Sequence, residues 1–132
     1  MTAPWQAQVA VLWALIGPPL LVYAATRVRR GMITRHAAIM IAAVVVETGV
    51  LLGFGLLEQP SPRRALLAVQ PLFRIHLALA YATLAGMTWQ IGSRLVPALG
   101  RWHRRTGPFV VAVWCLALLT GIYNFVFIYL AP

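Results

Sequence analysis

The chain has 132 residues, of which 61% are hydrophobic and only 10% charged. Soluble domains carry about 25% charged residues, and a soluble particle of this size has too much surface per volume to hide so many apolar side chains from water. The composition therefore excludes an ordinary soluble domain. The eleven basic residues are all arginine and give a formal net charge of +9. They are confined to short segments between apolar runs, a distribution typical of membrane topology rather than of nucleic-acid binding.

Four apolar runs fill the chain and leave nothing for a soluble domain. A helix of about 20 apolar residues crosses the hydrocarbon core of a bilayer, and the runs cover residues 5–25, 37–57, 72–91 and 108–130. The sequence thus predicts one transmembrane domain over residues 1–132. Because short loops make consecutive helices antiparallel neighbours, we expect an all-α fold, an integral membrane four-helix up-down bundle.

The arginines are unevenly divided between the loops. The first and third loops hold eight of them, namely Arg27, Arg29, Arg30, Arg35, Arg94, Arg101, Arg104 and Arg105. The middle loop holds three, Arg63, Arg64 and Arg74, together with Glu58. By the positive-inside rule the first and third loops are cytoplasmic. We therefore expect a multi-pass protein of the bacterial inner (cytoplasmic) membrane with both termini outside.

Small residues and prolines mark particular places in the first two spans. Gly17, Pro18 and Pro19 lie near the middle of the first span, where proline removes a backbone donor and predicts a kink. Gly49 and Gly53 form a small-xxx-small pair in the second span. Such a pair permits close approach of another helix, and we expect it to pack within the chain, with a dimer face as the alternative.

Glu47 is the ionisable residue that lipid should most strongly exclude. It lies about ten residues from either end of the second span, close to the bilayer midplane at 1.5 Å per residue. Ionisable residues at that depth are costly and indicate function by default. Three interpretations stay open: a neutral acid hydrogen-bonded to a neighbouring helix, a proton relay, or a contact to a cofactor.

Three histidines, His36, His76 and His103, each lie at or just before the N-terminal turn of a predicted helix. The positive end of the helix dipole disfavours the charged ring, and the neutral ring is the form that ligates metal or haem iron. All three are therefore candidate metal ligands, the alternative being polar rings at the membrane interface. Only His36 and His103 are expected at one membrane level, so they are the candidate haem pair. His76 is expected near Asn124 and Tyr123.

The segment 101–108 reads as a basic interfacial hook. Trp102 suits the headgroup layer, Pro108 suits a first helical turn, and Arg101, Arg104 and Arg105 would hold lipid phosphates or an acidic partner loop. Elsewhere the sequence has no nucleophile–base pair and no glycine-rich phosphate loop, so we do not expect an enzyme. Cys115 is the only cysteine, which excludes an intrachain disulfide.

Four pieces of the sequence, in order, resemble a known family. They are Ile33, Thr34, Arg35, His36 and Met40; the segment 73–78; Trp89 with Gln90; and the segment 103–108, continued by Trp114, Thr120, Gly121 and Tyr123. The chain from Gly31 to Leu130 resembles a family of small four-helix bacterial membrane proteins of unknown function. That family includes the CtaM (YozB) type factor linked to maturation of cytochrome aa3, a haem-copper oxidase.

The resemblance implies an integral membrane assembly or accessory factor for a haem-copper respiratory oxidase, with His36, His76 and His103 as the recurring histidines. Haem b and copper are the candidate cofactors, and the partners would be membrane lipids and a larger membrane complex, without nucleic acid. The sequence departs from the family in its shortened middle loop, its lack of lysine and its double proline. Two alternatives follow: a permanent structural subunit of a respiratory or photosynthetic complex, and a small b-type cytochrome.

Overall fold

The computed structural model describes residues 3–57 and 62–130 and is helical throughout its regular elements. Four long helices dominate: α1 (Trp5–Arg29), α2 (Ile33–Leu57), α4 (Pro71–Leu95) and α5 (Gly100–Phe125). Three short elements accompany them: α3 (Pro62–Ala68), the 3₁₀ turn η1 (Pro97–Leu99) and the π-helical turn η2 (Val126–Leu130). The predicted all-α class is therefore confirmed. Glu58 and the side chains of Arg63 and Arg64 lie outside the described residues.

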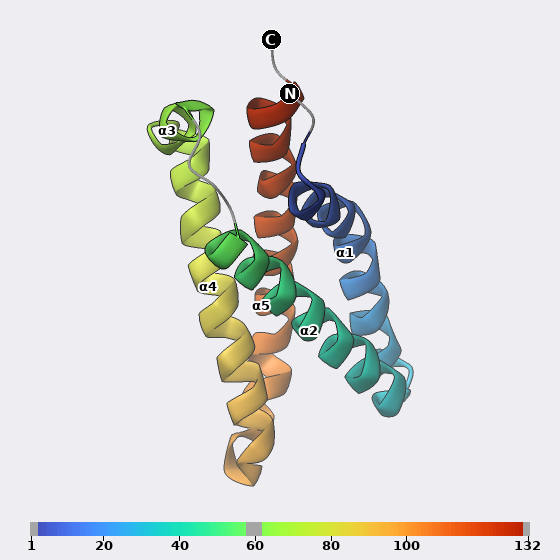
Figure 1. Cartoon of the computed structure of the whole chain (residues 1–132). Coiled ribbons are helices and arrows are strands. Elements are labelled where there is room, and N and C mark those ends of the chain that lie inside the picture. Colours follow the sequence, from blue (N-terminus) through green and yellow to red (C-terminus); the bar gives the residue numbers. More distant parts are fainter. Residues whose placement is uncertain (1–2, 58–61, 131–132) are drawn as a thin grey trace.

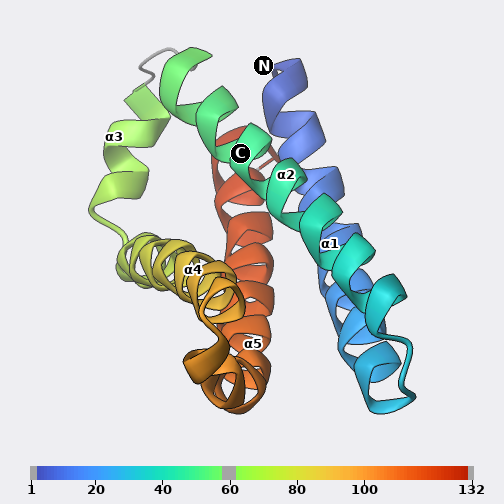
Figure 2. The ribbon, with the colours of Figure 1, turned by 90° about the horizontal axis from the view of Figure 1, so that it is seen from below.

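The long helices form two hairpins that meet along α1 and α5. Helix α1 packs against α2, and α4 packs against α5, while α1 and α5 join the two pairs. Figure 1 shows both hairpin turns in the lower part of the molecule, opposite the ends of the described chain. Seen from below, α5 lies between α4 and α1, and α2 crosses the assembly obliquely (Figure 2). In both views the two hairpin turns diverge from one another.

Several helix boundaries differ from the sequence prediction because arginine-rich segments that suit a loop are also good helix formers. Helix α2 begins at Ile33 rather than residue 37, and α5 begins at Gly100 rather than residue 108. The predicted hook is thus helical. Pro108 lies inside α5 and not in its first turn, so that expectation was wrong. The middle loop also contains the unpredicted helix α3.

Three of the described helical stretches are long and apolar enough to cross a membrane: Trp5–Arg29, Ile33–Gly53 and Pro97–Leu130. The remaining predicted span, 72–91, coincides with α4 but does not reach the same apolarity. Polar side chains such as Thr83, Thr88 and Gln90 lower it. The fold is compatible with a helical membrane bundle.

The core joins the hairpins through close helix contacts. Its buried members are Trp13, Ala14, Leu21, Ala43, Met87, Trp114 and Leu118. Helix α1 continues through Pro18 and Pro19, and beside them a Cβ added at Gly17 would lie 2.7 Å from Leu118 Cδ1. The glycine is what allows α1 to approach α5 there. In contrast, no atom of another described element lies within 4 Å of such a Cβ at Gly49 or Gly53, so the expected packing of this pair on another helix of the chain is not found among the described residues.

Candidate functional site

Glu47 lies at the point where three helices converge, and two indoles bind one of its oxygens. Trp13 Nε1 on α1 donates to Glu47 Oε2 at 2.7 Å, and Trp114 Nε1 on α5 donates to the same oxygen at 2.8 Å. Glu47 is 8% exposed and Trp114 is fully buried. Both distances fall in the range of charge-assisted N–H···O bonds, about 2.7–2.9 Å. We call Glu47, Trp13 and Trp114 the indole–carboxylate cluster.

A cavity of about 400 Å³ opens beside this cluster. Every long helix contributes to its wall, and α3 and η2 complete it. Small residues leave the space, because Ala10, Ala14, Ala80, Ala117 and Gly121 line it where larger side chains would fill it. Sites for small molecules have this character: several hundred Å³, mostly apolar walls and a few polar groups.

Two further polar side chains face the same cavity, His76 on α4 and Asn124 on α5. Asn124 is 9% exposed, and its Oδ1 has no hydrogen-bond partner in the described part of the chain. His76 Nδ1 lies 3.1 Å from Ala117 O and 3.0 Å from Thr120 Oγ1. Because a carbonyl oxygen only accepts, Nδ1 carries the proton in this contact, and the ring ties α4 to α5. His76 and Asn124, which the sequence predicts to lie near one another, thus line the same cavity.

His36 makes the corresponding contact inside the first hairpin. Its Nδ1 donates to Ala24 O of α1 at 2.9 Å. In metal sites an Nδ1–H bonded to a backbone carbonyl orients the ring and leaves Nε2 for the metal. His36 and His76 therefore both have the ring orientation of a ligand.

His103 closes the second hairpin through Gln90. Its Nδ1 lies 3.0 Å from Gln90 O, and Trp89 Nε1 donates to Thr106 Oγ1 at 3.0 Å. The Gln90 side-chain amide fits best with its oxygen toward Gly107 N, at 3.1 Å, which brings its nitrogen within 2.8 Å of His103 Nδ1. The backbone carbonyl and the side-chain amide nitrogen of Gln90 thus both lie within hydrogen-bond distance of His103 Nδ1.

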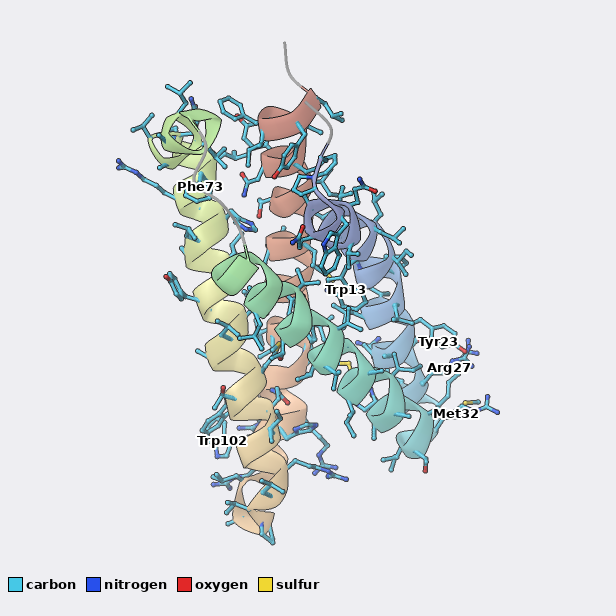
Figure 3. The ribbon with its side chains drawn as sticks, in the orientation of Figure 1. Trp13, Tyr23, Arg27, Met32, Phe73 and Trp102 are labelled. Carbon is cyan, nitrogen blue, oxygen red and sulfur yellow. The ribbon has the colours of Figure 1, made fainter. Side chains whose placement is uncertain are left out.

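The structure does not bring the histidines together. His36 and His103 lie near the turns of different hairpins, and these turns diverge (Figures 1 and 2). Figure 3 marks the two turns by Met32 and Trp102, which lie well apart. In the described residues no group of three or more His, Cys, Asp or Glu side chains is placed to hold a metal ion. A haem ligated by His36 and His103, and a metal site involving all three histidines, stay predictions.

The basic residues near the turns stack on aromatic rings. The guanidinium carbons of Arg101 and Arg105 lie 5.8 and 5.7 Å from the centre of the Trp102 ring. At the other turn Arg27 lies 4.1 Å from the centre of the Tyr23 ring. Arg101, Trp102, Arg104 and Arg105 are all exposed, as contact to lipid or to a partner requires. Contact of these residues with lipid or with a partner protein stays a prediction.

The partners of Glu47 were not predicted from the sequence. Trp13 and Trp114 are 34 and 67 residues away from it. Each lies within an apolar run, where a tryptophan is predicted to be an ordinary packing residue. One signal was present, since an acid at membrane depth requires donors and an indole N–H is a donor. Which indoles face it depends on the rotation of three helices.

Comparisons with protein-family models, with curated proteins and with solved structures found no match to this chain.

Proposed function

We propose that the protein is an integral membrane assembly or accessory factor for a haem-copper respiratory oxidase and catalyses no reaction itself. In this proposal its four long helices cross the bacterial inner membrane as an up-down bundle with both termini outside. The choice of a haem-copper oxidase as the partner rests on the motif resemblance described above. The position of the histidines in the structure is a second argument.

The observation that carries the proposal is that the oriented histidines stand singly. His36 and His76 each have Nδ1 bonded to a carbonyl oxygen of the neighbouring helix, the arrangement that leaves Nε2 for a ligand. Each ring belongs to a different helix, and no three-ligand group surrounds either in the described residues. A metal held by one such ring needs its other ligands from a partner, which suits a factor that acts during assembly.

Within this proposal we favour copper over a haem held by two histidines of this chain. Imidazole is a ligand for copper, as it is for iron and zinc, and the partner would complete the coordination. A haem held by two histidines of one chain needs both rings at the same place, whereas the two hairpin turns diverge (Figure 1). The proposal therefore gives the histidines a role in holding copper transiently.

Deletion and complementation in the bacterial host test the proposal. Without the protein we expect membranes to lose the reduced-minus-oxidised haem a absorbance and the copper of the mature oxidase, while other cytochromes persist. The wild-type gene should restore both. The His36→Ala and His76→Ala variants should restore the haem a absorbance and the copper content only partly. The control Ala38→Ser, an exposed change on the same helix as His36, should restore both quantities fully. Normal oxidase in the deletion strain would refute the proposal.

Co-purification in a mild detergent separates this function from a permanent subunit. An assembly factor is expected with the oxidase in less than stoichiometric amount, and chiefly when maturation is interrupted. One copy of the chain per mature complex would instead show a structural subunit.

A further inference from the structure

Glu47 lies at the cavity wall, and its Oε2 accepts the two indole hydrogen bonds. Among the described residues no arginine is found in an ion pair with the carboxylate, and His76 is a titratable side chain that shares the cavity. Indole N–H groups are neutral donors, so they satisfy hydrogen bonding but do not cancel a charge. A carboxylate at the wall of a low-dielectric cavity attracts a cation strongly.

Asn124 adds a second acceptor at the same cavity. Its side chain is more than nine-tenths buried, it lines the space, and Oδ1 has no partner among the described residues. A buried carbonyl oxygen without a donor costs about 1–3 kcal/mol, so the site is incomplete without a ligand or ordered water that donates to it. An alkylammonium group supplies three N–H donors and a positive charge, enough to pair with Glu47 and to donate to other acceptors of the cavity wall, such as Asn124 Oδ1.

The rest of the cavity wall favours a ligand whose remaining part is apolar. Trp13, Phe73, Phe125 and Leu118 line it, and Figure 3 shows Phe73 near the upper end of α4 and Trp13 lower, at α1. The space of about 400 Å³ is far larger than a metal ion needs. Aromatic faces also attract cations through their quadrupole.

We propose that this cavity binds a lipophilic primary ammonium compound, with its charged group at Glu47 and Asn124 and its apolar part among the aromatic and aliphatic side chains. The cavity is shared with His76, to which the proposed function gives a role in holding copper. The two proposals are tested separately, because ammonium binding is measured on the purified protein and the oxidase role in the deletion strain.

Three probes with one apolar body and different head groups test the charge. Phenylbutylammonium, phenylbutanol and phenylbutanoate would be titrated into the full-length protein in a zwitterionic lipid nanodisc, with binding followed by calorimetry. We expect saturable binding of the ammonium compound, tighter than that of the alcohol by about tenfold or more, the value of a hydrogen bond to a charged group. The chain has a formal net charge of +9, so unspecific attraction would favour the carboxylate instead. Equal or tighter binding of phenylbutanoate or phenylbutanol would overturn the proposal.

Variants then locate the site. Glu47→Gln should abolish the preference for the ammonium compound over the alcohol, and Asn124→Ala should weaken ammonium binding. Ala80→Leu fills the cavity and should abolish binding of both compounds, whereas Ala78→Leu, an exposed change on the same helix, should leave them unchanged. Ammonium binding that survives Ala80→Leu would place it elsewhere and refute the proposal. If Glu47→Gln does not fold, as judged by circular dichroism, the Ala80/Ala78 pair and Asn124→Ala decide the question.

Discussion

Replacing Trp114 by phenylalanine removes one of the two donors to Glu47 and leaves most of the aromatic packing. The side chain is fully buried, and its Nε1 lies 2.8 Å from Glu47 Oε2. Hydrogen bonds to charged groups contribute about 1.5–3 kcal/mol, so we expect the free energy of unfolding to fall by at least this much. Loss of indole packing adds to the fall, and a double-mutant cycle separates the two terms.

In the cycle, Trp114→Phe is measured in the native chain and in Glu47→Leu, where no carboxylate remains. The packing loss is common to both backgrounds, so the difference reports the hydrogen bond. We expect a coupling of about 1.5–3 kcal/mol. Unfolding would be followed by far-ultraviolet circular dichroism as SDS is added to mixed micelles. Trp102→Phe is the matched control, because Trp102 is exposed and lies near a hairpin turn, and it should not couple to Glu47. A coupling for Trp114 below about 0.5 kcal/mol, the value of independent sites, would refute the reasoning.

The same unfolding assay tests two other features, and reporter fusions test the orientation. Gly17→Leu should destabilise the protein by about 1–3 kcal/mol because the new side chain would collide with Leu118. The control Gly49→Leu meets open space, and its free energy of unfolding should stay within about 0.5 kcal/mol of that of the native chain. Equal effects of the two substitutions would contradict the packing of α1 on α5. His36→Ala should cost about 1 kcal/mol by freeing the carbonyl of Ala24, and no measurable loss would show that this contact does not hold the hairpin. Alkaline phosphatase fused to the C-terminus should be active and the same enzyme fused after Arg30 inactive; the reverse pattern would overturn the predicted topology.

The helices could be predicted from the sequence, but their ends could not. Apolar runs of span length indicate where a helix must lie, because only a helix satisfies its own backbone in lipid. The segments 33–36 and 100–107 contain arginine, histidine and tryptophan, which suit an interfacial loop and a helix equally. Their assignment to α2 and α5 depends on contacts that close the hairpins, such as that of His36 with Ala24.

The site could be predicted only in part. Glu47 stands out because of what it costs in lipid, and His76 and Asn124 were placed together by depth alone. The positions of the histidines within the plane of the membrane could not be predicted from the sequence. His36 and His103 were assigned to one membrane level, but whether two residues at one level meet depends on how the hairpins are splayed, and no residue pattern within a single helix encodes that angle.

Polar contacts join α2 to α1 and α4 to α5, and this has a consequence for α2. In lipid, apolar surface gives little drive for helices to associate, so packing and interhelical hydrogen bonds select the arrangement. His36 joins α2 to α1, and His76 and Gln90 join α4 to α5. Helix α2 packs on α1 but not extensively on α5, and Glu47 links it to Trp114 through a single oxygen. That bond is a polar contact between α2 and α5 beside the cavity, so we expect a ligand that competes for Glu47 to loosen α2 from α5 there.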